Sequence, residues 1–113
     1  MTTHIRIDPA DGCWVARAEG AIIAESRSAL ALTEGDRAAV IYFPRTDVAM
    51  AFLEPSAHTT RCPHKGETAY FHIAGPAGTV ADAAWSYESP LPGVAAIAEC
   101  LAFDPAMVTV ERI

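Results

Sequence analysis

Short apolar runs, interrupted every few positions by glycine, proline or aspartate, extend along the whole chain. The clearest run is Ala39 to Phe43, because β-branched and aromatic residues favour strands and Pro44 ends the run. Gly75 to Gly78 has the residues of a hairpin turn. Further strands are predicted at 4–8, 13–18, 21–24, 29–34, 68–73, 80–87 and 107–113. Many short strands with little helix predict a mainly-β domain.

Two segments are predicted to be helical. Residues 47–53 are expected to form a helical turn with Asp47 as the N-cap and with Met50 and Leu53 facing the core. Glu54-Pro55-Ser56 is expected to end this turn. Residues 94–100 are the best helix candidate, with Cys100 on the helix and Ala102 to Pro105 as the break that ends it.

The composition limits the class of protein. A chain of 113 residues with 51% hydrophobic content is expected to form one domain, 1–113, with its own core. The net charge, 8 − 14 = −6, argues against a nucleic-acid partner, which normally requires a basic patch. The N-terminus has no apolar signal region, and no stretch approaches the ~20 apolar residues of a membrane helix. We therefore expect a cytoplasmic protein with no membrane partner.

The chemically richest run is Arg61-Cys62-Pro63-His64-Lys65-Gly66. Cys62 is either a thiolate activated by nearby cations or a small buried apolar residue beside a turn. Lys65 could hold an anionic group while Gly66 lets the backbone approach it closely. Alternatively, Gly66 takes a positive φ in a turn and Lys65 is only solvated. Both interpretations stay open at this point.

Two other blocks carry candidate site residues. Arg45 could clamp a carboxylate or phosphate bidentately, or it could form a structural pair with Asp47. Trp85 and Tyr87 share one face of a strand and could form an aromatic pocket wall or part of the core. Asp82 could orient a cation or cap a turn.

The sequence argues against a metal cofactor. His58, Cys62 and His64 do not have an established zinc spacing, and the three cysteines include no Cys-x-x-Cys pair. The odd number of cysteines also argues against a disulfide framework. A metal site completed by distant Cys13 or Cys100 is a less favoured alternative. We expect no metal and no other cofactor.

Several blocks in combination resemble the DUF427 family, a domain of unknown function common in bacteria. They include Tyr-Phe-Pro-Arg at 42–45, Cys-Pro-His-Lys-Gly at 62–66 and Trp-Ser-Tyr at 85–87. The resemblance covers nearly the whole chain and implies an Mss4-like, or β-tent, fold. In that fold, antiparallel sheets pack at an angle around a cavity. The family often has tyrosine where this chain has His64.

These features favour binding of a small molecule, with an anionic one as the first candidate. The expected pocket residues are Arg45, Asp47, His64, Lys65, Gly66, Trp85 and Tyr87, with Cys62 as the candidate catalytic residue. Whether the protein is an enzyme stays open. One alternative is a non-catalytic module that binds a protein or a second copy of itself. A weaker alternative is a redox enzyme that uses Cys62, although no clear resolving cysteine accompanies it.

Overall fold

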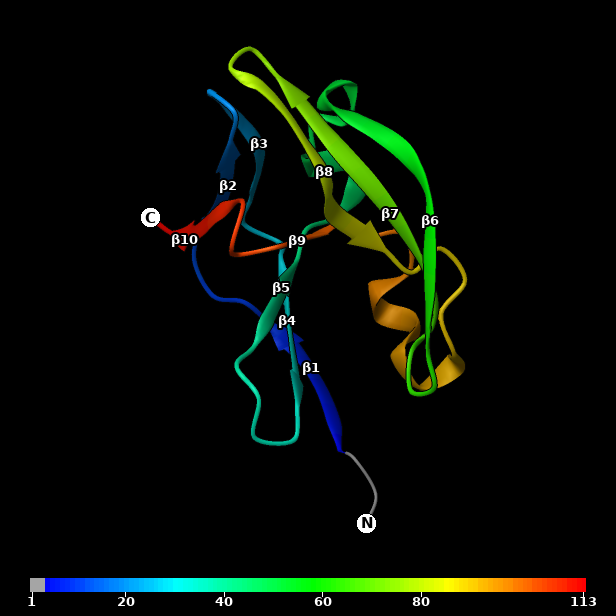
Figure 1. Ribbon diagram of the computed structural model, residues 1–113. Coiled ribbons are helices and arrows are strands. Elements are labelled where there is room, and N and C mark those ends of the chain that lie inside the picture. Colours follow the sequence, from blue (N-terminus) through cyan, green and yellow to red (C-terminus); the bar gives the residue numbers. More distant parts are fainter. Residues whose placement is uncertain (1–3) are drawn as a thin grey trace.

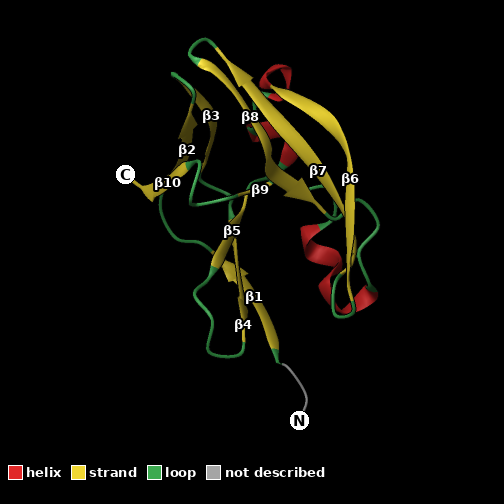
Figure 2. Ribbon diagram, viewed as in Figure 1, coloured by secondary structure: helices red, strands yellow, loops and turns green. Residues whose placement is uncertain are grey.

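Antiparallel β-strands dominate the computed structural model, which describes residues 4–113 (Figure 1). Short 3-10 helices are the helical elements of this part of the chain (Figure 2). The strands are β1 (Ile5–Pro9), β2 (Trp14–Ala18), β3 (Ala21–Ser26), β4 (Leu30–Glu34), β5 (Val40–Tyr42), β6 (Leu53–Cys62), β7 (Gly66–Gly75), β8 (Gly78–Ser86), β9 (Ala102–Phe103) and β10 (Thr109–Arg112). The 3-10 helices are η1 (Arg45–Asp47), η2 (Met50–Phe52) and η3 (Pro92–Ile97).

The described strands form three antiparallel sheets, with the orders β1-β4-β5, β10-β2-β3 and β6-β7-β8-β9. Phe43 and Leu101 join the first sheet to the third by exchanging two backbone hydrogen bonds, at 2.8 and 2.9 Å. Figure 1 shows β9 near the middle of the molecule, with the other strands around it. The mainly-β prediction is confirmed, and the arrangement is consistent with the β-tent-like fold that the resemblance implies.

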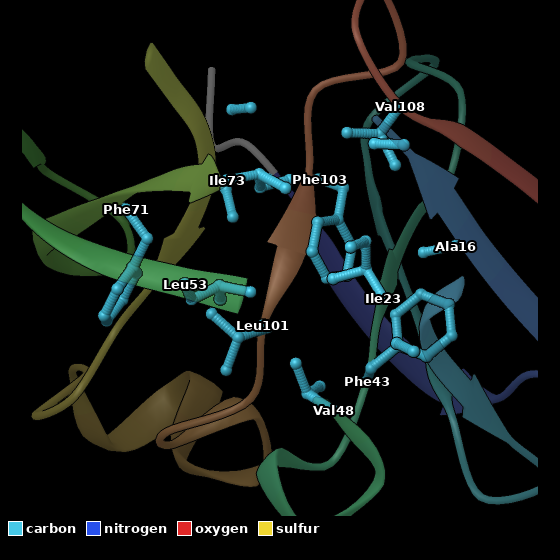
Figure 3. Close-up of a cluster of buried hydrophobic side chains, with 14 residues drawn as sticks. Ala16, Ile23, Phe43, Val48, Leu53, Phe71, Ile73, Leu101, Phe103 and Val108 are labelled. Atoms are coloured by element: carbon cyan, nitrogen blue, oxygen red, sulfur yellow. The ribbon is translucent and has the colours of Figure 1, made fainter. Parts of the chain in front are cut away.

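The largest cluster of buried apolar side chains lies where the sheets converge (Figure 3). Phe43, which follows β5, meets Phe103 of β9 edge to face, with ring centroids 5.6 Å apart. Ile23 of β3 and Ile73 of β7 are fully buried in the same cluster. Each sheet thus buries one face against the others, as strands with alternating apolar residues require.

The predicted strands at 4–8, 13–18, 21–24, 39–43, 68–73 and 80–87 are confirmed within a few residues. The run predicted as a strand at 29–34 is β4. The hairpin turn at 75–78 is also confirmed, since Gly75 pairs with Gly78. The last strand is shorter than the predicted 107–113, because residues 105–107 form a turn before β10.

Both helix predictions need correction. The segment 94–100 is not an α-helix, because η3 ends at Ile97 and Val94 breaks its geometry. Ala98 is non-helical and forms a bridge to Tyr87, the residue after β8. This pairing overrides the local helix preference, and Cys100 lies outside the helix. The helical turn at 47–53 is two separate 3-10 turns, and Asp47 is the last residue of η1 rather than an N-cap.

Two predicted breaks are strands. Glu54-Pro55-Ser56 lies inside β6, an edge strand, where Pro55 is tolerated because the sheet continues on one side only. A bulge follows, between Pro55 and Thr59. Ala102 and Phe103 form β9, which pairs with Ala84 and Trp85.

Candidate functional site

A cavity of about 370 Å³ lies between the sheet of β1, β4 and β5 and the sheet of β6 to β9. All three tyrosines of the chain line it, so we name it the tyrosine cavity. Its walls are formed by Leu32, Glu34, Arg37, Ala38, Val40, Tyr42, Thr60, Arg61, Cys62, Lys65, Thr68, Tyr70, Asp82, Trp85, Tyr87 and Asp104.

Residues two apart in the sequence, on a strand or at its end, supply most of these walls. The pairs are Leu32 and Glu34, Val40 and Tyr42, Thr60 and Cys62, Thr68 and Tyr70, and Trp85 of β8 with Tyr87, which directly follows β8. Side chains at i and i+2 point to the same face of a strand. Each of these strand segments therefore turns one face to the cavity. The alternation in the sequence is the local reason that these side chains meet.

Lys65 and Glu34 form the ion pair of the cavity. Lys65 Nζ donates to Glu34 Oε1 at 2.8 Å, and the two side chains are only 11% and 12% exposed. Lys65, the only lysine in the sequence, also lies 6.0 Å from the centroid of the Tyr87 ring. Among the cations of the described residues that form ion pairs, it is the most enclosed.

The ion pair holds both of its members in the charged form. The hydrogen bond from Lys65 lowers the pKa of Glu34 below its ordinary value, against the opposing effect of burial. Burial acts to lower the pKa of Lys65, but the hydrogen bond to Glu34 and nearby acidic groups outweigh it, so the pKa is raised. Lys65 is consequently a fixed cation at neutral pH rather than a free amine nucleophile.

The phenols and hydroxyls of the walls form a second polar set. The indole N–H of Trp85 donates to the hydroxyl of Tyr42 at 3.4 Å, and the Thr68 and Tyr87 side chains line the same cavity. Burial raises the pKa of Tyr42 and of Tyr87, so both remain neutral phenols. The hydroxyls of Thr60 and Tyr70 lie 3.1 Å apart. The walls can therefore both donate and accept hydrogen bonds.

The structure brings part of the Arg61 to Gly66 run to this cavity. Cys62 and Lys65 line it, and Cys62 is half-buried and not in a disulfide. His64 is exposed in the turn between β6 and β7 and does not line the cavity. Gly66 is buried beside Pro90 and Leu91 and has a φ of +117°, which favours glycine at this turn.

Arg45 and Asp47, predicted as pocket residues, are engaged elsewhere. Arg45 donates to the backbone carbonyl of Glu99 at 2.8 Å and to the hydroxyl of Ser86 at 3.2 Å, and it also pairs with Glu88. Asp47 accepts a 2.6 Å hydrogen bond from Ser26. Neither residue lines the tyrosine cavity. Trp85 and Tyr87 from the third predicted block do line it.

Asp82 combines backbone strain with an unpaired buried oxygen. It lies in a bulge of β8 opposite His72, with a φ of +51°. Its backbone N–H donates to His72 Nδ1 at 3.1 Å. Its Oδ1 is buried without a hydrogen-bond partner among the described residues and lies 3.7 Å from His72 Nδ1. Strained residues concentrate at functional sites, so Asp82 is a candidate site residue.

Several residues of the cavity are not predicted as site residues from the sequence, including Glu34, Arg37, Tyr42, Thr68 and Tyr70. The spacing of two within the predicted strands is the signal that could have found Thr68 and Tyr70.

Within residues 4–113 no group of three or more His, Cys, Asp or Glu side chains is placed to hold a metal ion. None of the helices in this part of the chain is long and apolar enough to span a membrane.

Comparison with known proteins gives a family. No curated protein matches the chain. A family model described as a domain of unknown function (DUF427) matches residues 6–113, which is nearly the whole chain. The blocks that carry the resemblance, including the Cys62 to Gly66 and Trp85 to Tyr87 segments, lie within this match. The chain belongs to the DUF427 family.

Proposed function

We propose that this protein binds a small polar organic molecule in the tyrosine cavity. The observation that carries the proposal is the gathering of three tyrosines, Trp85 and the Lys65–Glu34 pair on one cavity of about 370 Å³. Ligand sites in proteins occupy about 300–1,000 Å³ and combine apolar or aromatic walls with a few fixed polar groups. The cavity has both properties.

The charges of the walls favour a ligand with little net charge. Three cations, Arg37, Arg61 and Lys65, and three carboxylates, Glu34, Asp82 and Asp104, line the cavity. Glu34 neutralises Lys65, so Lys65 alone is a weak anion site. An anionic ligand would instead depend on Arg37 and Arg61, which are exposed. A neutral or zwitterionic molecule that hydrogen-bonds to the phenols fits this balance better.

A thiol reaction at Cys62 is a second candidate function, supported by one specific observation. Cys62 lines the same cavity and is half-buried, whereas Cys13 and Cys100 are 7% and 8% exposed. A redox cycle confined to this chain would need one of those buried cysteines as its partner.

The interaction-module alternative has less support, because the large exposed apolar residues of the described chain come from four separate segments. These residues are Ile22, Leu91, Met107 and Ile113.

A thermal-shift screen against a metabolite library tests the binding proposal. A ligand of the folded protein raises the melting temperature by mass action. We expect a hit whose shift is lost in Ala38→Phe, because Ala38 is an exposed residue of the cavity wall and a phenyl ring there would occupy ligand space. The shift should also weaken in Lys65→Met and persist in Arg27→Met, which removes an exposed cation outside the cavity walls. Hits that survive in Ala38→Phe would refute this site.

Light scattering tests the interaction-module alternative. A stable dimer or larger assembly at micromolar concentration would favour it. A monodisperse monomer would count against self-association.

A further inference from the structure

A second cavity, of about 260 Å³, lies where strands of all three sheets meet. Both tryptophans of the chain line it, Trp14 from β2 and Trp85 from β8, and we name it the tryptophan cavity. Ile41 of β5, Phe103 of β9 and Val110 of β10 complete most of its wall. Its lining contains no charged side chain.

The polar atoms of the two indoles are already satisfied within the protein. Trp14 donates its ring N–H to the backbone carbonyl of Asp11 at 3.1 Å. Trp85 donates its ring N–H to Tyr42 at 3.4 Å. The remaining lining side chains are aliphatic, aromatic or proline, so the side chains of this cavity offer an occupant no free hydrogen-bonding group. Such a cavity selects apolar groups, and one of even ~150 Å³ can accept a benzene ring.

The two cavities are neighbours that share walls. Trp85 and Val40 line both of them. Along the loop before β5, Ala38 lines the tyrosine cavity and Ala39 lines the tryptophan cavity. After β9, Asp104 lines the first cavity, while its neighbours in sequence line the second. A polar cavity and an apolar cavity thus lie side by side.

We infer that the ligand is amphipathic, with its polar part in the tyrosine cavity and an apolar part, a short alkyl chain or a single ring, in the tryptophan cavity. This inference rests on the proposed function. The tryptophan cavity supplies affinity by removing apolar surface from water, and the tyrosine cavity supplies orientation through hydrogen bonds. Trp85 lies at the boundary of the two parts, since it donates to Tyr42 of the polar cavity and lines both cavities.

Tryptophan fluorescence with a series of straight-chain alcohols, from 1-butanol to 1-octanol, tests the inference. Both tryptophans line the cavity, so its occupation should change their emission. The dissociation constant should fall about fourfold for each added methylene until the cavity is filled, the increment typical of a buried methylene. Ala39→Phe should weaken 1-hexanol binding at least tenfold, because the new ring fills the apolar cavity.

The neighbouring variant Ala38→Phe is the matched control, since it adds the same ring at an exposed alanine that lines the other cavity. It should leave the dependence on chain length intact. Val110→Phe fills the tryptophan cavity from β10 and provides a second test if Ala39→Phe disturbs the loop. Equal effects of Ala38→Phe and Ala39→Phe, or no dependence on chain length, would overturn the apolar site.

The two proposals fail in different ways. If the wild type binds none of the alcohols but library hits still depend on Ala38, the amphipathic ligand is overturned and the proposed function stands. Alcohol binding that depends on Ala39, with no library hit, would overturn the proposed function and the polar half of the ligand. Library hits that lose affinity in both Ala38→Phe and Ala39→Phe would support the amphipathic ligand.

Discussion

Lys65 Nζ lies 2.8 Å from Glu34 Oε1, and this contact joins the turn after β6 to the end of β4 across the tyrosine cavity. The two residues are 31 positions apart, with Glu34 at the end of a strand of the first sheet and Lys65 in the turn that joins two strands of the third. Each side chain is nearly enclosed, so neither can be left without its partner at little cost in stability. The pair therefore fixes the separation of the two cavity walls.

Removal of one partner should destabilise the protein more than removal of both. Lys65→Met leaves the Glu34 carboxylate enclosed and unpaired, and we expect a loss of about 2 kcal/mol in the free energy of unfolding. Lys65→Met combined with Glu34→Gln should lose less than Lys65→Met alone. Urea denaturation of the two single variants, the double variant and the wild type measures the coupling. Additive losses would mean that the two charges act independently.

The same pair should shape the dependence of stability on pH. The folded-state pKa of Glu34 lies below its ordinary value of 4.5, so its contribution is present above pH 4.5 and is lost as the pH falls through the folded pKa. The folded-state pKa of Lys65 lies above 10.5, so its contribution is complete below pH 10.5 and is lost as the pH rises through the folded pKa. Between these limits the pair contributes a constant amount.

The measurement is the difference in unfolding free energy between the wild type and the Lys65→Met/Glu34→Gln variant across pH. This difference should form a plateau at neutral pH and decline at both extremes. A difference that slopes between pH 6 and 9 would show that other groups control it.

The alternation of residues in the sequence predicts the faces of the strands but not which faces meet. Trp85 and Tyr87 were predicted to share a face, and they do line one cavity. That Glu34 lies opposite Lys65 depends on how two sheets pack, which no local pattern encodes. Arg45 illustrates the same limit, because its partners Ser86 and Glu99 are brought to it by the β8 end and the turn after η3.

Even a methyl side chain added at Gly75, at the tip of the β7–β8 hairpin, should destabilise the protein. A Cβ added to Gly75 would lie 2.6 Å from the backbone oxygen of Glu19, which also accepts the N–H of Ala77 at 3.0 Å. Gly75→Ala must therefore shift the contact between this hairpin and the β2–β3 turn, with an expected loss of about 1–3 kcal/mol. Gly93→Ala is the control, because no atom lies within 4 Å of its added Cβ. Thermal denaturation of both variants compares them, and equal melting temperatures would contradict the close approach.

The three thiols should differ in their reactivity toward a disulfide reagent. Cys62 is half-buried on the cavity wall, while Cys13 and Cys100 are buried in the folded protein. Burial also raises the pKa of the Cys100 thiol, which lowers its thiolate fraction at neutral pH. We expect one fast thiol and two slow ones in a colorimetric assay of the native protein, with the fast phase absent in Cys62→Ser. Ala38→Phe should slow this phase, because its ring would narrow the cavity from which the reagent reaches Cys62, whereas Ala39→Phe should not. A fast phase that persists in Cys62→Ser would place the accessible thiol elsewhere and remove the support for thiol chemistry in the tyrosine cavity.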